Sequence, residues 1–270
     1  GTSIPAVWLS SAAPGIVVMI TYVILNYFMS RNFPLVMPPK LPLKEQVKMT
    51  VTALYRGIPI LLMPVLILGG VYGGITTPTE AAAVAVVYIF IVAFLFYKSF
   101  TWRQLGRTIY QAGATAGVIL VMLFFILVTS RVLVVQGIPQ QMANWVTETM
   151  KSRALVLFMV NVIMLVMGML MDDLSGTLLA ATVLYPIVAG VGVSPIHFAA
   201  IVGVNLGLGC TTPPCAPMLF LAGRIGNCPA QEYMKPALIL MFAGQLPALV
   251  LTTYWPDLSL FLPRLMGYIS

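Results

Sequence analysis

Two short polar segments interrupt apolar sequence in the second half of the chain, and both carry groups that can bind ions. The first, which we call the tip, runs Asp172-Asp173-Leu174-Ser175-Gly176-Thr177 and joins apolar arms at 154–171 and 177–191. An aspartate at the centre of a bilayer costs about 2.5–3.5 kcal/mol, so it persists mainly where it faces a cavity, a partner or an ion. Carboxylate and hydroxyl oxygens suit a hard cation. The tip therefore predicts a cation site, and the alternative is a surface turn whose hydrated aspartates cap the following helix.

The second segment, which we call the break, spans residues 207–214 (GLGCTTPP) within otherwise apolar sequence. Pro213 and Pro214 lack backbone N–H groups and cannot continue a helix. Backbone freed in this way is tolerated in a membrane only where it is buried or lines a watery site. Broken helices offer carbonyl groups to cations and helix ends to anionic substrates, and Thr211 and Thr212 add hydroxyls. The alternative is a proline kink without a functional role.

These two segments need elements that bring them together. Apolar arms joined by a short tip are typical of a re-entrant hairpin, whereas two complete crossings would place the tip at a membrane surface. A half-length helix at 196–209 follows, then the break, and apolar sequence resumes at 218–223. A hairpin followed closely by a discontinuous helix favours the mid-membrane site of an ion-coupled carrier.

Composition places this arrangement in a membrane. The chain of 270 residues is 60% hydrophobic and only 8% charged, compared with roughly 25% charged residues in soluble domains. A soluble fold of this length cannot bury so much apolar surface, whereas lipid accepts it. We therefore predict an all-α polytopic membrane protein.

The remaining apolar segments are joined by basic loops. We predict further spans at residues 15–29, 57–72, 81–97, 108–130 and 236–253. Residues 45–56 are predicted to be amphipathic and interfacial, and residues 137–153 to be a weakly amphipathic linker. The second and third spans are separated by a tight turn at Gly73, Gly74 and Pro78. Thr77 or Thr79 can cap the third span, where Glu80 fits the positive helix end.

The charge balance is 14 basic against 7 acidic residues, a net charge of +7. The basic residues cluster in two short loops, 40–56 and 98–107, which is the positive-inside pattern and predicts that both loops are cytoplasmic. No basic groove with interleaved aromatic residues is evident, so nucleic acid is not a predicted partner.

Other chemistry-bearing residues favour structural roles. Cys210, Cys215 and Cys228 are predicted to be small buried residues, because His197 is not at a metal-ligand spacing from them. His197 itself is predicted to be packed or interfacial. An intramembrane protease needs two facing carboxylates, whereas adjacent residues on a helix diverge by about 100°. We therefore predict no enzyme, and the other alternative is an ion channel or a structural membrane subunit with continuous spans.

A weak internal echo predicts a repeat. The opening GTSIPAVWLSSAAPGIVVM and the later LAGRIGNCPAQEYMKPALILM share a small-residue turn, Pro-Ala, and a proline that begins an apolar span. The echo predicts an inverted repeat and a chain that starts near the end of its first copy, with preceding segments missing. The resulting division is the end of a first repeat (1–14), scaffold-type helices (15–107), a span and connector (108–153), a transport unit (154–235), and a terminal span and tail (236–270).

At these residues the chain resembles the large membrane subunit (M subunit) of TRAP transporters, the tripartite ATP-independent periplasmic carriers. The resemblance rests on GGVYGGITTPTEAAAVAVVY, the linker and hairpin up to MDDLSG, SPIHFAAIVGVNLGLGCTTPPCAP, and the terminal YWPDLSLFLP. Because the family subunit is considerably longer than 270 residues, the chain looks like its C-terminal portion.

The resemblance implies an elevator-type secondary transporter with an inverted repeat, driven by a Na⁺ gradient, with no organic cofactor. It implies a small membrane subunit (Q subunit) and a periplasmic substrate-binding protein as partners, in the bacterial inner membrane. The implied cargo is a small organic anion: a dicarboxylate, a sialic acid, a sugar acid or a keto acid.

The resemblance also selects residues. The tip and the break match the family's sodium and substrate region, with Asp172 as the leading candidate and the doubled aspartate leaving Asp172 and Asp173 as alternatives. We expect substrate contacts from Asp172, Thr212 and Pro213. The expected sodium positions are Asp172, Asp173, Ser175, Gly176, Thr177, Gly207, Gly209, Thr211 and Thr212. Cys210 and Cys215 stand where the family commonly has aliphatic or small residues.

Overall fold

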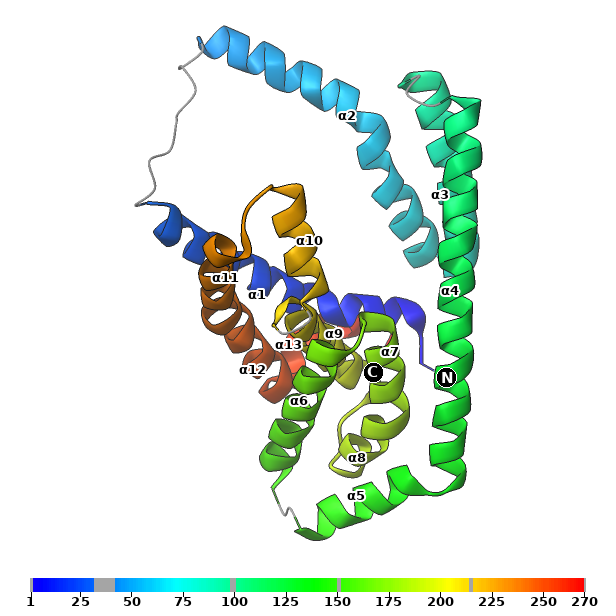
Figure 1. Cartoon of the computed structure of the whole chain (residues 1–270), viewed down its shortest axis with the longest axis vertical. Helices are drawn as coiled ribbons and strands as arrows, with labels where there is room; N and C mark the ends of the chain where they lie inside the picture. The colour runs from blue at the N-terminus through cyan, green and yellow to red at the C-terminus, as the bar shows by residue number, and fades with distance from the viewer. Residues whose placement is uncertain (1, 32–41, 98–100, 150–151, 214–215, 270) are drawn as a thin grey trace. The chain divides into compact units, whose positions relative to one another are not determined.

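The computed structural model describes residues 2–31, 42–97, 101–149, 152–213 and 216–269, and all regular structure in these ranges is helical (Figure 1). The elements are α1 (Ile4–Ser30), α2 (Leu43–Tyr72), α3 (Pro78–Ile91), η1 (Val92–Phe96), α4 (Trp102–Val135), α5 (Ile138–Thr149), α6 (Arg153–Leu170), α7 (Asp173–Leu179), η2 (Ala180–Leu184), α8 (Tyr185–Gly190), α9 (Pro195–Thr211), α10 (Pro217–Ile225), α11 (Ala230–Ile239), η3 (Leu240–Gln245), α12 (Leu246–Tyr254) and α13 (Pro256–Leu265). The three η elements are π-helical turns within longer helices.

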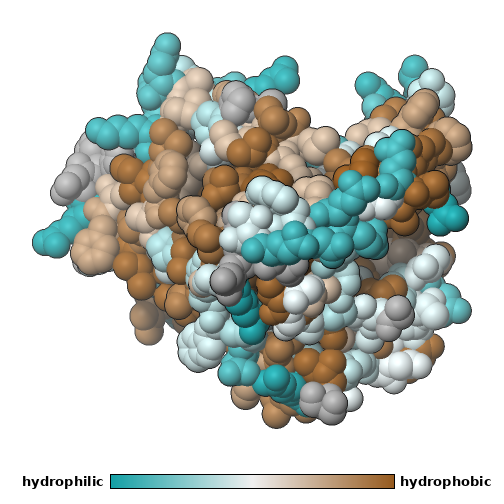
Figure 2. Space-filling view, turned by 90° about the horizontal axis from the view of Figure 1, so that it is seen from below, coloured by the Kyte–Doolittle hydropathy of each residue, from teal (hydrophilic) through white to brown (hydrophobic). Residues whose placement is uncertain are grey.

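In the part of the chain that the structure describes, seven helices are long and apolar enough to cross a membrane. They span residues 4–30, 43–72, 78–96, 102–135, 153–170, 173–190 and 230–254. Large hydrophobic side chains are exposed along them, including Phe28, Ile60 and Phe124, and hydrophobic residues are spread over the face shown in Figure 2. In water this surface would drive aggregation, whereas lipid solvates it. The chain is therefore an all-α polytopic membrane protein, as its composition predicted.

Several helices extend beyond the predicted spans. α1 begins at Ile4 rather than residue 15, and α2 is one continuous helix that includes both the amphipathic 45–56 and the apolar 57–72. α4 continues past Arg131 to Val135. Prolines lie inside the first two of these helices without ending them, which transmembrane helices tolerate. The long side chain of an arginine near a helix end can reach out to polar surroundings, so Arg131 does not end α4.

The chain divides into two compact units, residues 34–118 and residues 1–33 with 119–270. In the smaller unit, α2 packs against α3. The Tyr88 hydroxyl donates to the carbonyl of Pro59 at 2.6 Å, and the Tyr97 hydroxyl donates to the carbonyl of Arg56. These bonds join the C-terminal part of α3 and the residue after η1 to the middle of α2.

The predicted turn between the second and third spans is confirmed, and Thr77 caps the N-terminus of α3. The Glu80 carboxylate accepts from the Thr77 amide at 2.8 Å, while the Thr77 hydroxyl oxygen accepts from the Glu80 amide at 3.3 Å. This is a capping box, in which each residue satisfies an amide that the helix leaves unpaired. Glu80 therefore has the local role predicted for it.

We expect Glu80→Gln to leave transport by the complete carrier within about twofold, because glutamine also completes a capping box. Thr77→Ala, by contrast, should cost about 1 kcal/mol of stability through the lost cap. Uptake assays and thermal unfolding of the two purified variants would check this. A large loss of uptake in Glu80→Gln at unchanged stability would show that the charge of Glu80, and not only its capping bond, is used.

The larger unit is built around α9, whose residues are mostly buried. This helix contacts α1, α6, α7, α12 and α13, and together with α6, α8 and α12 it forms the main hydrophobic core. His197, in its first turn, is 1% exposed, and its Nε2 lies 2.8 Å from the carbonyl oxygen of Thr252. The prediction that His197 is packed is confirmed.

The predicted pair of apolar arms is confirmed as two antiparallel helical arms, α6 and α7–η2–α8, which we call the hairpin (Figure 1). The second arm begins at Asp173, four residues before the predicted start at 177, because Asp172 caps it. At the π-helical turn of this arm, the Thr182 hydroxyl lies 3.0 Å from the Ser130 hydroxyl of α4. Two hydroxyls thus link the second arm of the hairpin to α4.

Candidate functional site

The tip is organised around the Asp172 carboxylate. Its Oδ2 accepts from the amides of Leu174 at 3.1 Å and Ser175 at 3.2 Å, and its Oδ1 accepts from the Ser175 hydroxyl at 2.5 Å. The capping function that the alternative interpretation gave to the aspartates is therefore present. Each carboxylate oxygen has two lone pairs, so Oδ2 is fully used and Oδ1 retains one acceptor position. Asp172 is exposed, and its carboxylate is held rigidly with one position left for a ligand.

Hydroxyl and carbonyl oxygens also gather at the C-terminal end of α9. The Thr211 hydroxyl bonds the carbonyls of Gly207 and Leu208, and the Thr212 hydroxyl bonds that of Leu208 at 2.6 Å. The carbonyl of Gly209 accepts from the Thr212 amide at 2.9 Å. The helical partner of the Cys210 carbonyl would be the N–H of residue 214, which is a proline and has none. The negative end of α9 is therefore oxygen-rich, as the break predicted.

Two glycines bring the hairpin and α9 into backbone contact. A Cβ built on Gly209 would lie 2.6 Å from Cα of Gly168 in α6, and one built on Gly168 would lie 2.9 Å from Cα of Gly209. On the other arm, a Cβ at Gly176 would lie 3.1 Å from the Leu206 side chain. The tip and the break, separated by some thirty residues in sequence, are thus neighbours in space. The prediction that they lie together is confirmed by this packing.

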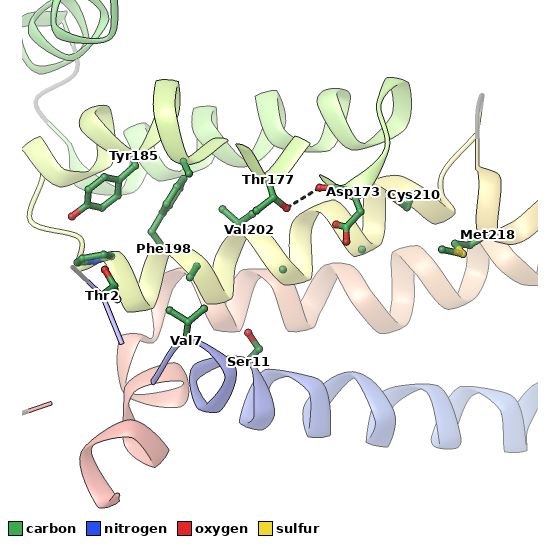
Figure 3. Close-up of a pocket in the computed structure, with 15 residues that line it drawn as sticks. Thr2, Val7, Ser11, Asp173, Thr177, Tyr185, Phe198, Val202, Cys210 and Met218 are labelled. Carbon is green, nitrogen blue, oxygen red and sulfur yellow. Dashed lines mark hydrogen bonds between the residues drawn. The ribbon is translucent and has the colours of Figure 1, made fainter. Parts of the chain in front are cut away.

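A cavity of about 650 Å³ opens beside this contact (Figure 3). Asp173 and Thr177 line it from the hairpin, Cys210 from α9, and Ser11 from α1. Figure 3 shows Asp173 and Cys210 on the side of the cavity nearest the tip, with Tyr185 and Phe198 at the opposite end. Of the predicted site residues, Asp173, Thr177 and Gly207 line this cavity. The predicted residues that do not line it are Asp172, Ser175, Gly176, Gly209, Thr211, Thr212 and Pro213.

The other lining positions were not predicted, and they include Ser11, Cys210 and Met218. Cys210 lies inside the break but was taken as a small buried residue, and it is indeed 7% exposed. Ser11 belongs to the opening segment that echoes the sequence after the break. That echo was the signal that could have placed it near the site. Among the described cysteines Cys228 is partly exposed, so the prediction of burial was wrong there, and Cys215 lies outside the described residues.

The electrostatics of this region favour a cation. Asp173 is the one charged side chain among the cavity-lining residues that the structure describes, and Asp172 precedes it in sequence. Both lie close to the negative end of α9. Within the described ranges no group of three His, Cys, Asp or Glu side chains could hold a metal ion. The oxygens available are carboxylate, hydroxyl and backbone carbonyl, a set that fits a hard cation rather than a soft transition metal.

A family model matches residues 1–258, nearly the whole chain. Its description is the DctM component of the tripartite ATP-independent periplasmic transporter. The chain belongs to this family. The resemblance seen in the sequence motifs is thereby confirmed. Family members are TRAP transporter permeases, which are not enzymes.

Curated relatives support the same assignment. The chain is 31% identical, over 98% of its length, to a C4-dicarboxylate TRAP transporter large permease of Pseudomonas aeruginosa, and 29% identical, over 99%, to a sialic acid large permease of Vibrio cholerae. An isethionate TRAP permease of Oleidesulfovibrio alaskensis is 33% identical over 74% of the chain. The chain spans 61% of the first relative, 62% of the second and 32% of the third.

Proposed function

We propose that the transporter containing this chain couples the inward movement of Na⁺ to the import of a small organic anion. Family membership supports transport, and the names of the relatives include carriers of C4-dicarboxylates, sialic acid and isethionate. All three cargoes are organic anions. The observation that carries the sodium proposal is the backbone contact of Gly168 with Gly209, which brings the end of the hairpin that bears the hydrogen-bonded Asp172 carboxylate next to the proline-ended α9.

Asp172 and the end of α9 form the proposed sodium site. The free acceptor position on Asp172 Oδ1 and the carbonyl of Cys210 supply oxygen ligands, with Thr212 adjacent. Sodium, when bound, would supply the positive charge that offsets the acidic tip. Asp173 contributes further negative charge on the cavity side. A neutralised tip can then lie against an anion, whereas the bare tip would repel it.

The cavity beside the tip is the proposed place for the anion. The Ser11 hydroxyl can donate to a carboxylate or sulfonate, and the Thr177 hydroxyl can do so when it releases the Asp173 carbonyl that it bonds at 2.8 Å. The first turn of the second arm is a positive helix end, which favours negative charge. Because the chain spans about three fifths of its longer relatives, other parts of the transporter would complete this site.

The partners and location follow from the same proposal. A small membrane subunit and a periplasmic binding protein would act with this permease in the bacterial inner membrane, and the isethionate relative carries the combined name DctMQ. An elevator-type movement of the hairpin and α9 would carry the site across the membrane. The predicted inverted repeat would place a second hairpin opposite the tip.

The proposal is tested with the complete transporter and its binding protein in proteoliposomes. Uptake of a C4-dicarboxylate, isethionate and sialic acid is measured with an inward Na⁺ gradient and with the same gradient of K⁺. We expect one of these classes to accumulate, and only with Na⁺. Equal accumulation in K⁺ would overturn sodium coupling, and passive ion flux without solute uptake would indicate a channel instead.

A further inference from the structure

Two neighbouring residues of α9, Val204 and Asn205, are held by amide hydrogen bonds to two other helical segments, η3 and α6. Asn205 Nδ2 donates to the carbonyl of Asn161 at 3.0 Å and to its Oδ1 at 2.7 Å. Asn161 in turn donates to the Thr253 hydroxyl of α12 at 3.1 Å. A chain of hydrogen bonds therefore joins α9, the first arm of the hairpin and α12.

The carbonyl of Val204 accepts from Gln245 Nε2 at 3.4 Å, and Gln245 Oε1 accepts from the Tyr22 hydroxyl of α1 at 2.9 Å. The Gln245 amide also lies beside the break, since a Cβ on Gly207 would be 3.5 Å from Nε2. Gln245 ends the π-helical turn η3, whose wider winding changes the direction of side chains after it. Val204 and Asn205 are thus bonded directly to η3 and α6, and through Gln245 and Asn161 they are connected to α1 and α12.

These bonds are poorly explained by stability alone. Hydrogen bonds between membrane helices contribute on average only about 0.6 kcal/mol. Asn205 is fully buried, yet its Oδ1 has no hydrogen-bond partner among the described residues, and an unsatisfied buried acceptor costs about 1–3 kcal/mol. Apolar side chains of the same size would pack here at no such cost. Amide side chains can instead fix the register of the helices, because a hydrogen bond sets the position of one helix along another. A single buried asparagine has this effect in coiled coils.

The register that is fixed is that of the tip against the end of α9. Asn161 and Gly168 are seven residues apart on α6, and Asn205 and Gly209 are four apart on α9, so each pair lies on one helix face. The amide pair therefore holds the same interface in which the two glycines bring the backbones together. A shift of α9 along α6 would move its terminal carbonyls away from the Asp172 carboxylate.

We propose that Asn161, Asn205 and Gln245 are positioning residues of the sodium site, which set the distance between the tip and the end of α9. This inference rests on the proposed sodium-coupled function. None of the three side chains needs to touch the ion. Their effect is exerted through the backbone of residues 204–211.

The test is a double variant, Asn161→Leu with Asn205→Leu, in the complete transporter. Replacing both residues by apolar groups of similar size removes the unpaired Oδ1 of Asn205, which offsets the hydrogen bond that the Thr253 hydroxyl loses, so stability should change little. We expect the Na⁺ concentration for half-maximal uptake to rise about tenfold, equivalent to about 1.4 kcal/mol in sodium binding. The thermal unfolding midpoint of the purified protein should remain close to that of the parent. Ser259→Ala is the matched control, because it also removes a buried polar group, one without a partner in the described structure.

Should the double variant fail to fold, Gln245→Met tests the other amide hydrogen bond to α9. The same rise in the Na⁺ concentration for half-maximal uptake is expected. An unchanged sodium midpoint in a folded variant, with uptake still sodium-dependent, would overturn the positioning role alone. A parallel fall in stability and maximal rate at constant sodium midpoint would show that these residues only hold the fold, and would also overturn it. Sodium-independent uptake by the parent transporter would overturn the proposed function itself.

Discussion

Replacing Asp172 by asparagine should raise the Na⁺ concentration needed for uptake while leaving the hairpin folded. Asparagine caps a helix about as well as aspartate does, so the amides of Leu174 and Ser175 keep an acceptor. The change therefore isolates the charge. A carboxylate and a cation about 4 Å apart interact by roughly 1 to 4 kcal/mol at effective dielectric constants between those of water and a protein surface. Sodium affinity should fall by between about fivefold and several hundredfold.

The measurement is uptake as a function of sodium concentration, together with the thermal unfolding midpoint. Asp172→Ala is the informative companion, because it loses both charge and cap and should lower stability by about 1 kcal/mol as well. Asp173→Asn is the matched control, because it removes the neighbouring carboxylate charge. No hydrogen bond of the Asp173 carboxylate is found in the described structure. The sodium requirement of the Asp173→Asn variant should therefore change less than that of Asp172→Asn. If Asp173→Asn abolished sodium coupling and Asp172→Asn retained it, Asp173 would be the sodium ligand. Asp172 would then serve only as a helix cap.

The sequence predicted the tip and the break because their signals are local. Two prolines without N–H groups end a helix wherever they occur, and aspartates between apolar arms mark a turn. Both features are found, at Asp172 and at the end of α9. The reliance on local signals also explains why α1 and α2 were predicted to be shorter than they are. Pro14 and Pro59 resemble helix breakers in sequence, but neighbouring helices and lipid allow the helix to continue through them.

The parts of the site that sequence did not reveal depend on long-range packing. Asn161 and Asn205 are 44 residues apart, and Tyr22 and Gln245 are 223 apart. A polar residue in an apolar span signals that a partner exists without identifying it. The contact between Gly168 and Gly209 is similar, since glycine in a membrane helix has many explanations. Capping by Asp172 was considered only as an alternative to ion binding, whereas the geometry allows one carboxylate to do both.

The second large effect is expected from Gly209→Ala. The new methyl group would lie 2.6 Å from Cα and 2.7 Å from the carbonyl carbon of Gly168. These are backbone atoms that cannot rotate away, so α6 and α9 must move apart. Overpacking of this kind typically costs about 1–3 kcal/mol and occasionally more. We expect the variant to lose nearly all uptake, with a lower unfolding midpoint, because the separation occurs where the tip meets the end of α9.

Three alanine variants distinguish close approach from a general cost of replacing glycine. Gly168→Ala fills the same contact from the other side and should resemble Gly209→Ala. Gly176→Ala meets only the end of the flexible Leu206 side chain at 3.1 Å, so its effect should be milder. Gly117→Ala meets nothing within 4 Å in the described structure and should be neutral or slightly stabilising. If Gly209→Ala transported as well as Gly117→Ala, the two backbones could not be in contact during transport. The sodium site would then have to be assembled without the end of α9, because the contact that holds its carbonyls beside Asp172 would be dispensable.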